Sequence, residues 1–254
     1  MPLDPKPQYP GSHHADALAQ VRLAAESLRH RWASHLNQPG SRVRQVNGTG
    51  GGCSPFTGTD QLMTDFNTLR RDLRAARLSL TAAHRREFNR LITAHTLPLL
   101  QYTQHVAAYV ACRGEFDPAA IIHALSAQQV YVPVVAGQDQ ALRFVAYQPG
   151  DALAPNVFGI AEPVSGQEIA PTELDRVLTP LLGFDEQGFR LGMAGGFYDR
   201  SFAFRHHHNG PPWLIGVAYE MQKIPLQTPR DWDVRLDAVV TEAGVYRCNP
   251  QCPV

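Results

Sequence analysis

The pattern of apolar and polar positions changes at about residue 62, and the part that follows alternates between strand and helix patterns. From residue 106 onward, short apolar runs are separated by polar turns and helical segments. One helix is expected from Asp117 to about Ala127, where an aspartate cap is followed by Pro118. Strands that alternate with helices form a mostly parallel sheet covered on both faces, so we predict an α/β fold. The expected strands span residues 106–111, 130–135, 142–147, 177–182, 214–219 and 238–241.

Two amphipathic helices are predicted before these strands. Asp65 can cap the first helix, and a second apolar stripe follows within residues 88–99. A row of arginines on the first helix is either a solvated face or a cluster that reaches phosphates, and spacing alone does not decide between them. The apolar face of the first helix is Phe66, Leu69, Leu73, Ala76 and Leu80, and its arginines are Arg70, Arg71, Arg74 and Arg77.

Residues 1–62 form a different kind of sequence, which we predict to be a largely disordered amino-terminal extension. Flanks rich in Pro, Gly, Ser and Asn surround one helical pattern at residues 16–36. A single amphipathic helix cannot bury its own apolar stripe, so it docks on the main domain, binds a partner or stays partly disordered. We therefore expect an α/β domain at residues 63–254 behind this extension.

Composition narrows the class of protein. The chain has 254 residues, of which 44% are hydrophobic and 18% charged, as is typical of a soluble globular protein. Its 23 basic and 23 acidic residues give a formal net charge of +0, which argues against a nucleic-acid partner. Because the sequence has neither a long apolar run nor a signal-peptide pattern, we expect a cytoplasmic protein without a membrane partner. The four cysteines, Cys53, Cys112, Cys248 and Cys252, lack the spacing of a zinc site and are expected to be reduced thiols.

A glycine-rich turn at residues 190–200 stands out as candidate chemistry. Gly192, Gly195 and Gly196 remove side chains where a backbone approaches an anion, and Phe197 opens a predicted helix. Backbone N–H groups at such a junction of strand and helix bind phosphate, although glycine clusters also occur in ordinary turns. Both interpretations stay open on this segment alone.

Four carboxylates are candidates for a site. Glu115 follows the strand at 106–111, and Glu162 precedes a proline in a loop. Asp199 and Asp233 together suit Mg²⁺, which proteins hold through one or two carboxylates plus substrate phosphates. Loop carboxylates are often solvated, however, and aspartates often cap helices or strands, so spacing alone leaves these alternatives open.

The order of four segments is more specific than any single one. The segments read FGIAEP at 158–163, PLLGFD at 180–185, RLGMAGGFYDR at 190–200 and DVRLDAVVTE at 233–242. In this order and spacing, and with the arginine-rich first helix, they resemble the 5-formyltetrahydrofolate cyclo-ligase family, also called methenyltetrahydrofolate synthetase. The resemblance covers about residues 68–247, whereas neither a dinucleotide-binding G-x-G-x-x-G after the first strand nor a Walker phosphate loop is present.

The resemblance implies a three-layer α/β/α domain with a Rossmann-like sheet. It also implies conversion of 5-formyltetrahydrofolate into 5,10-methenyltetrahydrofolate with ATP and Mg²⁺, releasing ADP and phosphate. In that reaction ATP phosphorylates the formyl oxygen, N10 attacks the activated carbon, and phosphate leaves as the ring closes. Such chemistry depends on positioning and charge neutralisation. We expect a monomer with this small-molecule substrate.

Site residues follow from the resemblance position by position. The catalytic set is Arg190, Tyr198 and Asp199, and the metal ligands are Asp199 and Asp233. The expected ATP-binding residues are Arg70, Arg74, Gly192, Met193, Ala194, Gly195, Gly196 and Phe197. The expected folate-binding residues are Glu115, Phe144, Tyr147 and Glu162, with core packing as the alternative for the two aromatic residues.

The sequence also departs from the family's pattern. Phe66 and Gln128 stand where the family often has Lys, and Met193 and Ala194 stand where many members have an aromatic or basic residue followed by Gly. The Cβ of Ala194 is tolerable near the phosphate path only if its φ angle is negative. These departures favour, as the alternative function, a homologue that binds folate or nucleotide with weak or no turnover.

Overall fold

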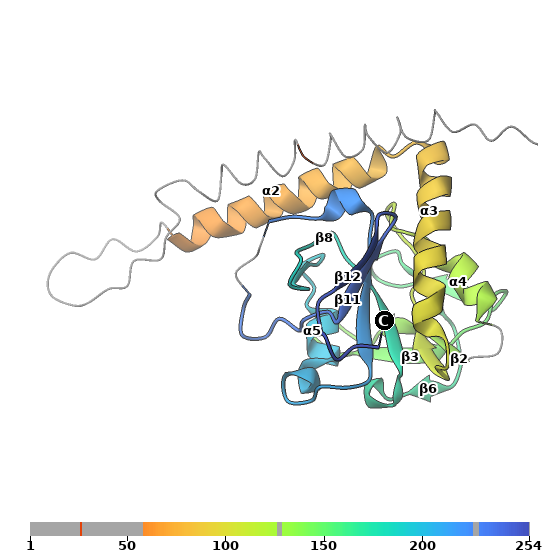
Figure 1. The fold of residues 1–254 in the computed structure, drawn as a ribbon. Helices are drawn as coiled ribbons and strands as arrows, with labels where there is room; N and C mark the ends of the chain where they lie inside the picture. Colours follow the sequence, from red (N-terminus) through yellow and green to blue (C-terminus); the bar gives the residue numbers. More distant parts are fainter. Residues whose placement is uncertain (1–25, 27–57, 126–128, 226–228, 254) are drawn as a thin grey trace, which may run out of the picture.

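The computed structural model describes Glu26 and residues 58–125, 129–225 and 229–253 (Figure 1). The predicted helix at 16–36 lies outside the described residues, apart from Glu26, which is helical. The helices are α2 (Gly58–Leu78), α3 (Ala82–Thr96), α4 (Ala119–Ala124) and α5 (Phe197–Ser201). Short 3₁₀ turns are η1 (Leu97–Leu100), η2 (Pro171–Glu173), η3 (Ala203–His206) and η4 (Glu220–Gln222).

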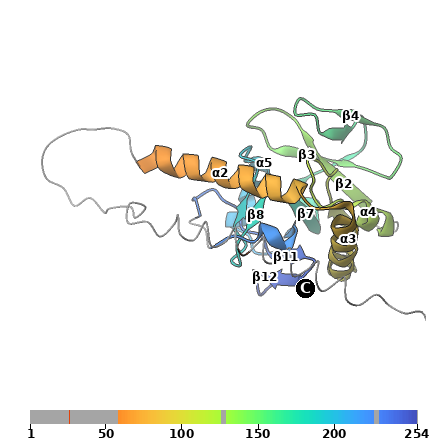
Figure 2. The same ribbon diagram turned by 90° about the horizontal axis from the view of Figure 1, so that it is seen from above.

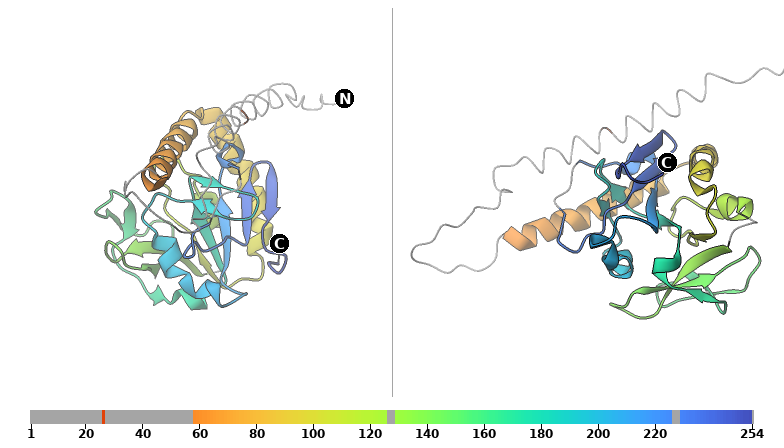
Figure 3. Two further views of the ribbon diagram at one scale, coloured as in Figure 1. Left: turned by 90° about the vertical axis from the view of Figure 1, so that its left-hand side faces the viewer. Right: turned by 60° about the horizontal axis from the view of Figure 1, so that its bottom comes forward.

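The main sheet has eight strands in the order β12-β11-β10-β7-β1-β2-β3-β6. Neighbours from β11 to β2 pair in parallel, whereas β12, β3 and β6 pair antiparallel at the edges. Figure 3 shows this order running from β12 in dark blue to β2 and β3 in green. The strands are β1 (His105–Ala107), β2 (Gln129–Val135), β3 (Leu142–Ala146), β6 (Glu168–Ile169), β7 (Arg176–Pro180), β10 (Trp213–Val217), β11 (Ala238–Thr241) and β12 (Gly244–Arg247).

Alternation along the strands divides the buried side chains between two faces. Leu178 and Val240 pack with α3 and α4, whereas their neighbours Val177 and Val239 pack with Phe202, next to α5. Helices therefore cover both faces, as Figure 1 shows with α3 and α5 on opposite sides of the sheet. This confirms the predicted α/β class with a mostly parallel sheet.

The helix α2 is longer than the sequence pattern predicted. It begins at Gly58, so Asp65 lies inside the helix rather than at its start, and the predicted boundary at 62/63 falls within it. Its apolar residues Leu69 and Leu73 pack on Leu191 and Ile224, away from the two main clusters. Seen from above, α2 crosses beside β8 (Figure 2). Two of its arginines contact the glycine-rich turn.

The turn itself follows a strand that is not part of the main sheet. β8 (Gly183–Phe184) and β9 (Arg190–Leu191) form a separate two-stranded ribbon beyond the carboxyl end of β7. Because both strands are two residues long, their apolar pattern was too short to predict. A second ribbon joins β4 (Leu153–Pro155) to β5 (Ala161–Pro163). No helix in the described ranges is both long and apolar enough to cross a bilayer.

Candidate active site

The glycine-rich turn links β9 to α5, as predicted, and contains two residues in the left-handed region. Gly196 has φ 61° and Ala194 has φ 74°. At Gly196 a Cβ would lie 2.8 Å from an Arg200 guanidinium nitrogen, so glycine suits both the backbone and the space. The positive φ of Ala194 contradicts the condition under which its Cβ was expected to be tolerable. The turn therefore contains one strained residue.

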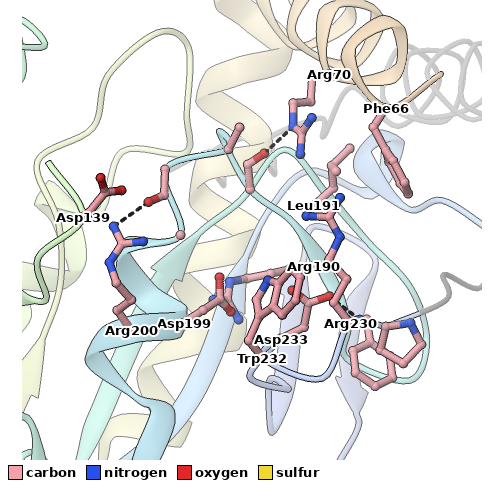
Figure 4. A pocket seen from close by; sticks show the side chains of 16 residues that line it. Phe66, Arg70, Asp139, Arg190, Leu191, Asp199, Arg200, Arg230, Trp232 and Asp233 are labelled. Atoms are coloured by element: carbon pink, nitrogen blue, oxygen red, sulfur yellow. Dashed lines mark hydrogen bonds and ion pairs between the residues drawn. The ribbon is translucent and has the colours of Figure 1, made fainter. Parts of the chain in front are cut away.

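Two arginines of α2 contact this turn, which brings together segments about 120 residues apart. Arg70 Nε donates to the carbonyl oxygen of Gly192 at 3.0 Å, and Arg74 lies 3.4 Å from the sulfur of Met193. The Nε of Arg74 is buried without a hydrogen-bond partner. Arg70 and Arg74 are thus not part of a solvated face, because both contact the turn; Figure 4 shows Arg70 pointing at it.

A pocket of about 290 Å³ opens between α2, the turn and the loop at 229–233. Figure 4 shows Phe66 and Arg70 projecting from α2, and Asp199 and Arg200 from α5. Its charged lining residues are Arg70, Arg190, Arg200, Arg230, Asp139, Asp199 and Asp233, and its wall includes Gly192, Ala194, Gly195 and Gly196. Four guanidinium groups around one cavity, next to glycine backbone, make an anion-binding site.

The electrostatics of Arg70 support this conclusion. Burial lowers the pKa of Arg70, and the positive charge of Arg230 lowers it further. Two cations that repel one another across a half-buried pocket are stabilised by an anion placed between them. A polyphosphate therefore fits the charges that the chain places there.

The two predicted metal ligands line the same pocket. Asp199 Oδ1 accepts hydrogen bonds from Arg190 at 2.6 Å and from the Val234 N–H at 3.1 Å. Asp233 Oδ2 accepts one from the Arg230 N–H at 2.9 Å. Within the described residues, each carboxylate keeps its other oxygen without a hydrogen bond.

Two free carboxylate oxygens beside an anion pocket fit Mg²⁺ bound mainly by phosphates. In the described part of the chain no three His, Cys, Asp or Glu side chains gather as a metal cage. Arg190 is committed to this aspartate and to the Val234 carbonyl oxygen, and its side chain is only 6% exposed. It holds Asp199 in place rather than projecting freely into the pocket.

Glu115 lies just beyond β1, on the side expected to bind folate. Its Oε2 accepts from the Cys112 N–H at 3.1 Å, and its Oε1 lies 3.9 Å from Arg77, which is 1% exposed. Burial, and then the charge of Glu115, raise the pKa of the Cys112 thiol to about 11. The carboxylate is thus held by α2 on one side and by its own loop on the other.

Tyr198 places a buried hydroxyl near this carboxylate. The hydroxyl oxygen has no hydrogen-bond partner among the described residues, and its ring stacks on Phe202 at 6.2 Å. Burial, followed by the charge of Glu115, raises the pKa of Tyr198 well above its usual value. A buried hydroxyl without a partner is costly, so a ligand that supplies one is favoured here.

Three predicted folate residues have other surroundings. Phe144 is fully buried and packs on Phe202 at 5.6 Å, so it has no surface left for a ligand. Tyr147 lines a second cavity, beside α4 and the amino-terminal end of β2, at the opposite end of the sheet. The burial of Phe144 favours core packing, the alternative given for both aromatic residues, and a folate-binding role for Tyr147 stays a prediction. Glu162 accepts from the Val135 N–H at 2.9 Å and from Asn156, and so anchors its loop to β2.

Several pocket residues could not be predicted from local sequence patterns. Arg200 donates to the carbonyl oxygen of Gly195 at 2.6 Å and was not assigned a role, although it lies in the turn segment. Asp139, Arg230 and Trp232 come from loops whose position depends on the whole fold. The sequence indication for them was that Arg230 and Trp232, a cation and an aromatic residue, directly precede the candidate ligand Asp233.

The fold and the site together define an α/β protein with an arginine-lined, anion-binding pocket at a glycine-rich turn. The profile of the "5-formyltetrahydrofolate cyclo-ligase family" matches residues 63–242. The 5-formyltetrahydrofolate cyclo-ligase of Haemophilus influenzae is 36% identical over 175 residues, which cover 66% of this chain and 92% of the relative. That of Escherichia coli K12 is 34% identical over 184 residues, covering 68% and 98%.

Solved structures agree with the sequence comparisons. The NMR structure of Aquifex aeolicus 5,10-methenyltetrahydrofolate synthetase is similar with a TM-score of 0.63 and 27% identity, covering 74% of this chain and 95% of that one. The Mycoplasma pneumoniae 5,10-methenyltetrahydrofolate synthetase, at 23% identity and a TM-score of 0.56, shows the same fold. The chain belongs to the 5-formyltetrahydrofolate cyclo-ligase family, which confirms the resemblance and the predicted enzyme class, a ligase of folate metabolism.

Proposed function

We propose that this chain converts 5-formyltetrahydrofolate into 5,10-methenyltetrahydrofolate with consumption of ATP and a requirement for Mg²⁺. The observation that carries the proposal is the pocket where guanidinium groups from α2, β9, α5 and the 229–233 loop surround the glycine-rich turn. Such a site neutralises a polyphosphate at the edge of the sheet, which is what transfer of a phosphoryl group to the formyl oxygen requires.

In the proposed nucleotide site, Arg70 and Arg200 provide positive charge for the phosphates. Each keeps part of its guanidinium for a ligand while another part bonds a carbonyl of the turn, Gly192 for Arg70 and Gly195 for Arg200. Arg74 supports the turn through Met193. The turn residues from Gly192 to Phe197 then present backbone to the phosphates.

The carboxylates of Asp199 and Asp233 would hold Mg²⁺ together with the phosphates. The bound ion would supply charge neutralisation during phosphoryl transfer. Arg190 orients Asp199 through its 2.6 Å ion pair, and the Val234 N–H fixes the same oxygen. The other oxygen of Asp199, which lines the pocket, would be the one that binds the ion.

On the folate side, Glu115 and Tyr198 would bind the pterin. Glu115 accepts hydrogen bonds, and the neutral Tyr198 hydroxyl both donates and accepts them. Phe158 offers an apolar ring between the proposed nucleotide and folate sites. It is 42% exposed and contacts Phe197 edge-on at 5.9 Å. The monomeric state and cytoplasmic location stay predictions.

A turnover assay tests the proposal directly. Purified full-length protein with 5-formyltetrahydrofolate, ATP and Mg²⁺ should give the methenyl product, seen by its absorbance near the visible edge, and equimolar ADP. Asp199→Asn should abolish both, because it weakens a metal ligand and removes the negative charge that pairs with the buried Arg190. Asp231→Asn alters an exposed aspartate of the same loop that does not line the pocket; it is the matched control and should keep wild-type rates. Absence of product with the wild-type protein would overturn the proposal.

A further inference from the structure

Arg230 lies in a short loop that the structure fixes tightly. Its N–H donates to Asp233 Oδ2 at 2.9 Å, and the Asp233 N–H donates back to the Arg230 carbonyl at 3.0 Å. These two hydrogen bonds close a turn that links Arg230, a cation of the pocket, to Asp233, a proposed metal ligand. The backbone of Arg230 is therefore positioned by Asp233, which also lines the pocket.

The Arg230 guanidinium lies beside two aromatic rings from different segments. Its central carbon is 6.0 Å from the Phe66 ring centroid, on α2, and 5.5 Å from that of Trp232. Cation–π contacts of this kind hold a guanidinium flat while leaving its in-plane N–H donors free. All three residues line the pocket of about 290 Å³ (Figure 4).

No carboxylate or carbonyl accepts a hydrogen bond from this guanidinium among the described residues. Stacking uses only its faces, so five N–H donors are left for a ligand. Burial lowers the pKa of the neighbouring Arg70, and repulsion by the charge of Arg230 lowers it further. An arrangement that keeps two cations close, with one of them lacking an anionic partner, is stabilised when an anion binds between them.

We infer that Arg230, positioned by Phe66 and Trp232, is a further ATP-binding residue whose guanidinium binds the polyphosphate together with Arg70. The inference rests on the proposed function, because it names ATP as the source of the anion. It gives Phe66 a role as an aromatic platform for a cation from a distant loop. A purely structural clamp between the loop and α2 is the alternative, and it requires no anion.

Calorimetric binding to the full-length protein separates these two roles. Arg230→Gln should weaken binding of Mg-ATP and of inorganic tripolyphosphate by the same factor, about ten-fold or more, as expected for a lost charge-assisted hydrogen bond. Arg71→Gln removes a positive charge from an exposed site on the same helix, where Asp72 is its partner, and should change neither affinity more than two-fold. Loss of ATP affinity with unchanged tripolyphosphate affinity would overturn the inference, because it would place Arg230 at the base.

A rescue variant gives the second measurement. Phe66→Lys removes the platform but places an ammonium in the pocket wall, so in the Arg230→Gln background it should restore most of the tripolyphosphate affinity. If Arg230 were only a structural clamp, losing Phe66 would damage that clamp further. Absence of rescue would overturn the inference, provided that circular dichroism shows both variants to be folded. Failure of the proposed function looks different, because the wild-type protein would then bind neither tripolyphosphate nor Mg-ATP. Wild-type binding with an unaffected Arg230→Gln variant would overturn only the inference.

Discussion

The strain at Ala194 predicts that replacing it with glycine stabilises the protein. Ala194 has φ 74° and is exposed, so its Cβ contributes little packing. An L-residue with a Cβ in the left-handed region costs roughly 1–2 kcal/mol. Glycine removes that cost, but it also increases the entropy of the unfolded chain, which costs roughly 0.5–1 kcal/mol. The expected net gain in the free energy of unfolding is therefore about 0.5 kcal/mol.

A matched substitution makes this small gain measurable. Ala75 is an exposed residue in α2, with helical backbone and the same side chain. Ala75→Gly should lower the free energy of unfolding by about 1 kcal/mol, as for glycine in an exposed helix. Because the unfolded-state term is the same in both variants, their difference of about 1.5 kcal/mol reports the conformation of the two folded backbones.

Thermal unfolding followed by circular dichroism is the assay, with Ala194→Gly and Ala75→Gly measured side by side. A difference of about 1.5 kcal/mol corresponds to roughly 3–6 °C in Tm for a chain of this size. Ala194→Gly should have the higher Tm of the two and at least match the wild type. Equal destabilisation by both substitutions would refute the left-handed conformation at residue 194 and, with it, the strain in the turn.

Three further predictions concern residues around the site. Phe144→Leu should lower the free energy of unfolding by about 1 kcal/mol, because the Phe144 ring packs in the core. The KM for 5-formyltetrahydrofolate should stay unchanged, and a large rise in KM would instead place Phe144 in the folate site. Arg77→Met should lower the free energy of unfolding, measured in urea, by about 3 kcal/mol. The reason is that it removes a buried cation that bonds two carbonyl oxygens and faces Glu115. A loss under 1 kcal/mol would argue against that network. With its pKa near 11, Cys112 has about one-hundredth of the ordinary thiolate fraction at pH 8, so iodoacetamide should modify it slowly and faster as pH rises towards 11. Glu115→Gln removes a charge that raises this pKa and should speed the modification, measured by mass spectrometry of the Cys112 peptide.

Strand patterns in the sequence located most of the sheet but not the ribbon that carries the site. The predicted strand at 238–241 coincides with β11, and that at 130–135 with β2 to within one residue. These runs are buried and β-branched, so local pattern and burial agree. β9 is only two residues long and is held by pairing with β8, which no local pattern encodes.

The site residues likewise divide into those that a local sequence pattern identifies and those that only the fold brings together. The turn and its aspartate were found because glycine and carboxylate occur together in one segment, near Asp199. Arg230 escaped notice because its role depends on Phe66, which is 164 positions earlier and lies beside it only after folding. The sequence left Phe144 between two roles for the complementary reason, since an aromatic residue on a strand is apolar whether it faces a ligand or the core.

The spacing of arginines on α2 explains how one helix serves both halves of the site. Arg70, Arg74 and Arg77 follow at intervals of four and three residues, so they lie along one side of the helix. The first two contact the turn at Gly192 and Met193, whereas Arg77 enters the core and approaches Glu115. Because a helix is rigid over seven residues, a shift of α2 that closes the nucleotide pocket also moves the partner of the folate-side carboxylate. We therefore predict that the two proposed binding sites are coupled through α2, so that a variant that loosens Arg77 changes the apparent affinities for both substrates together.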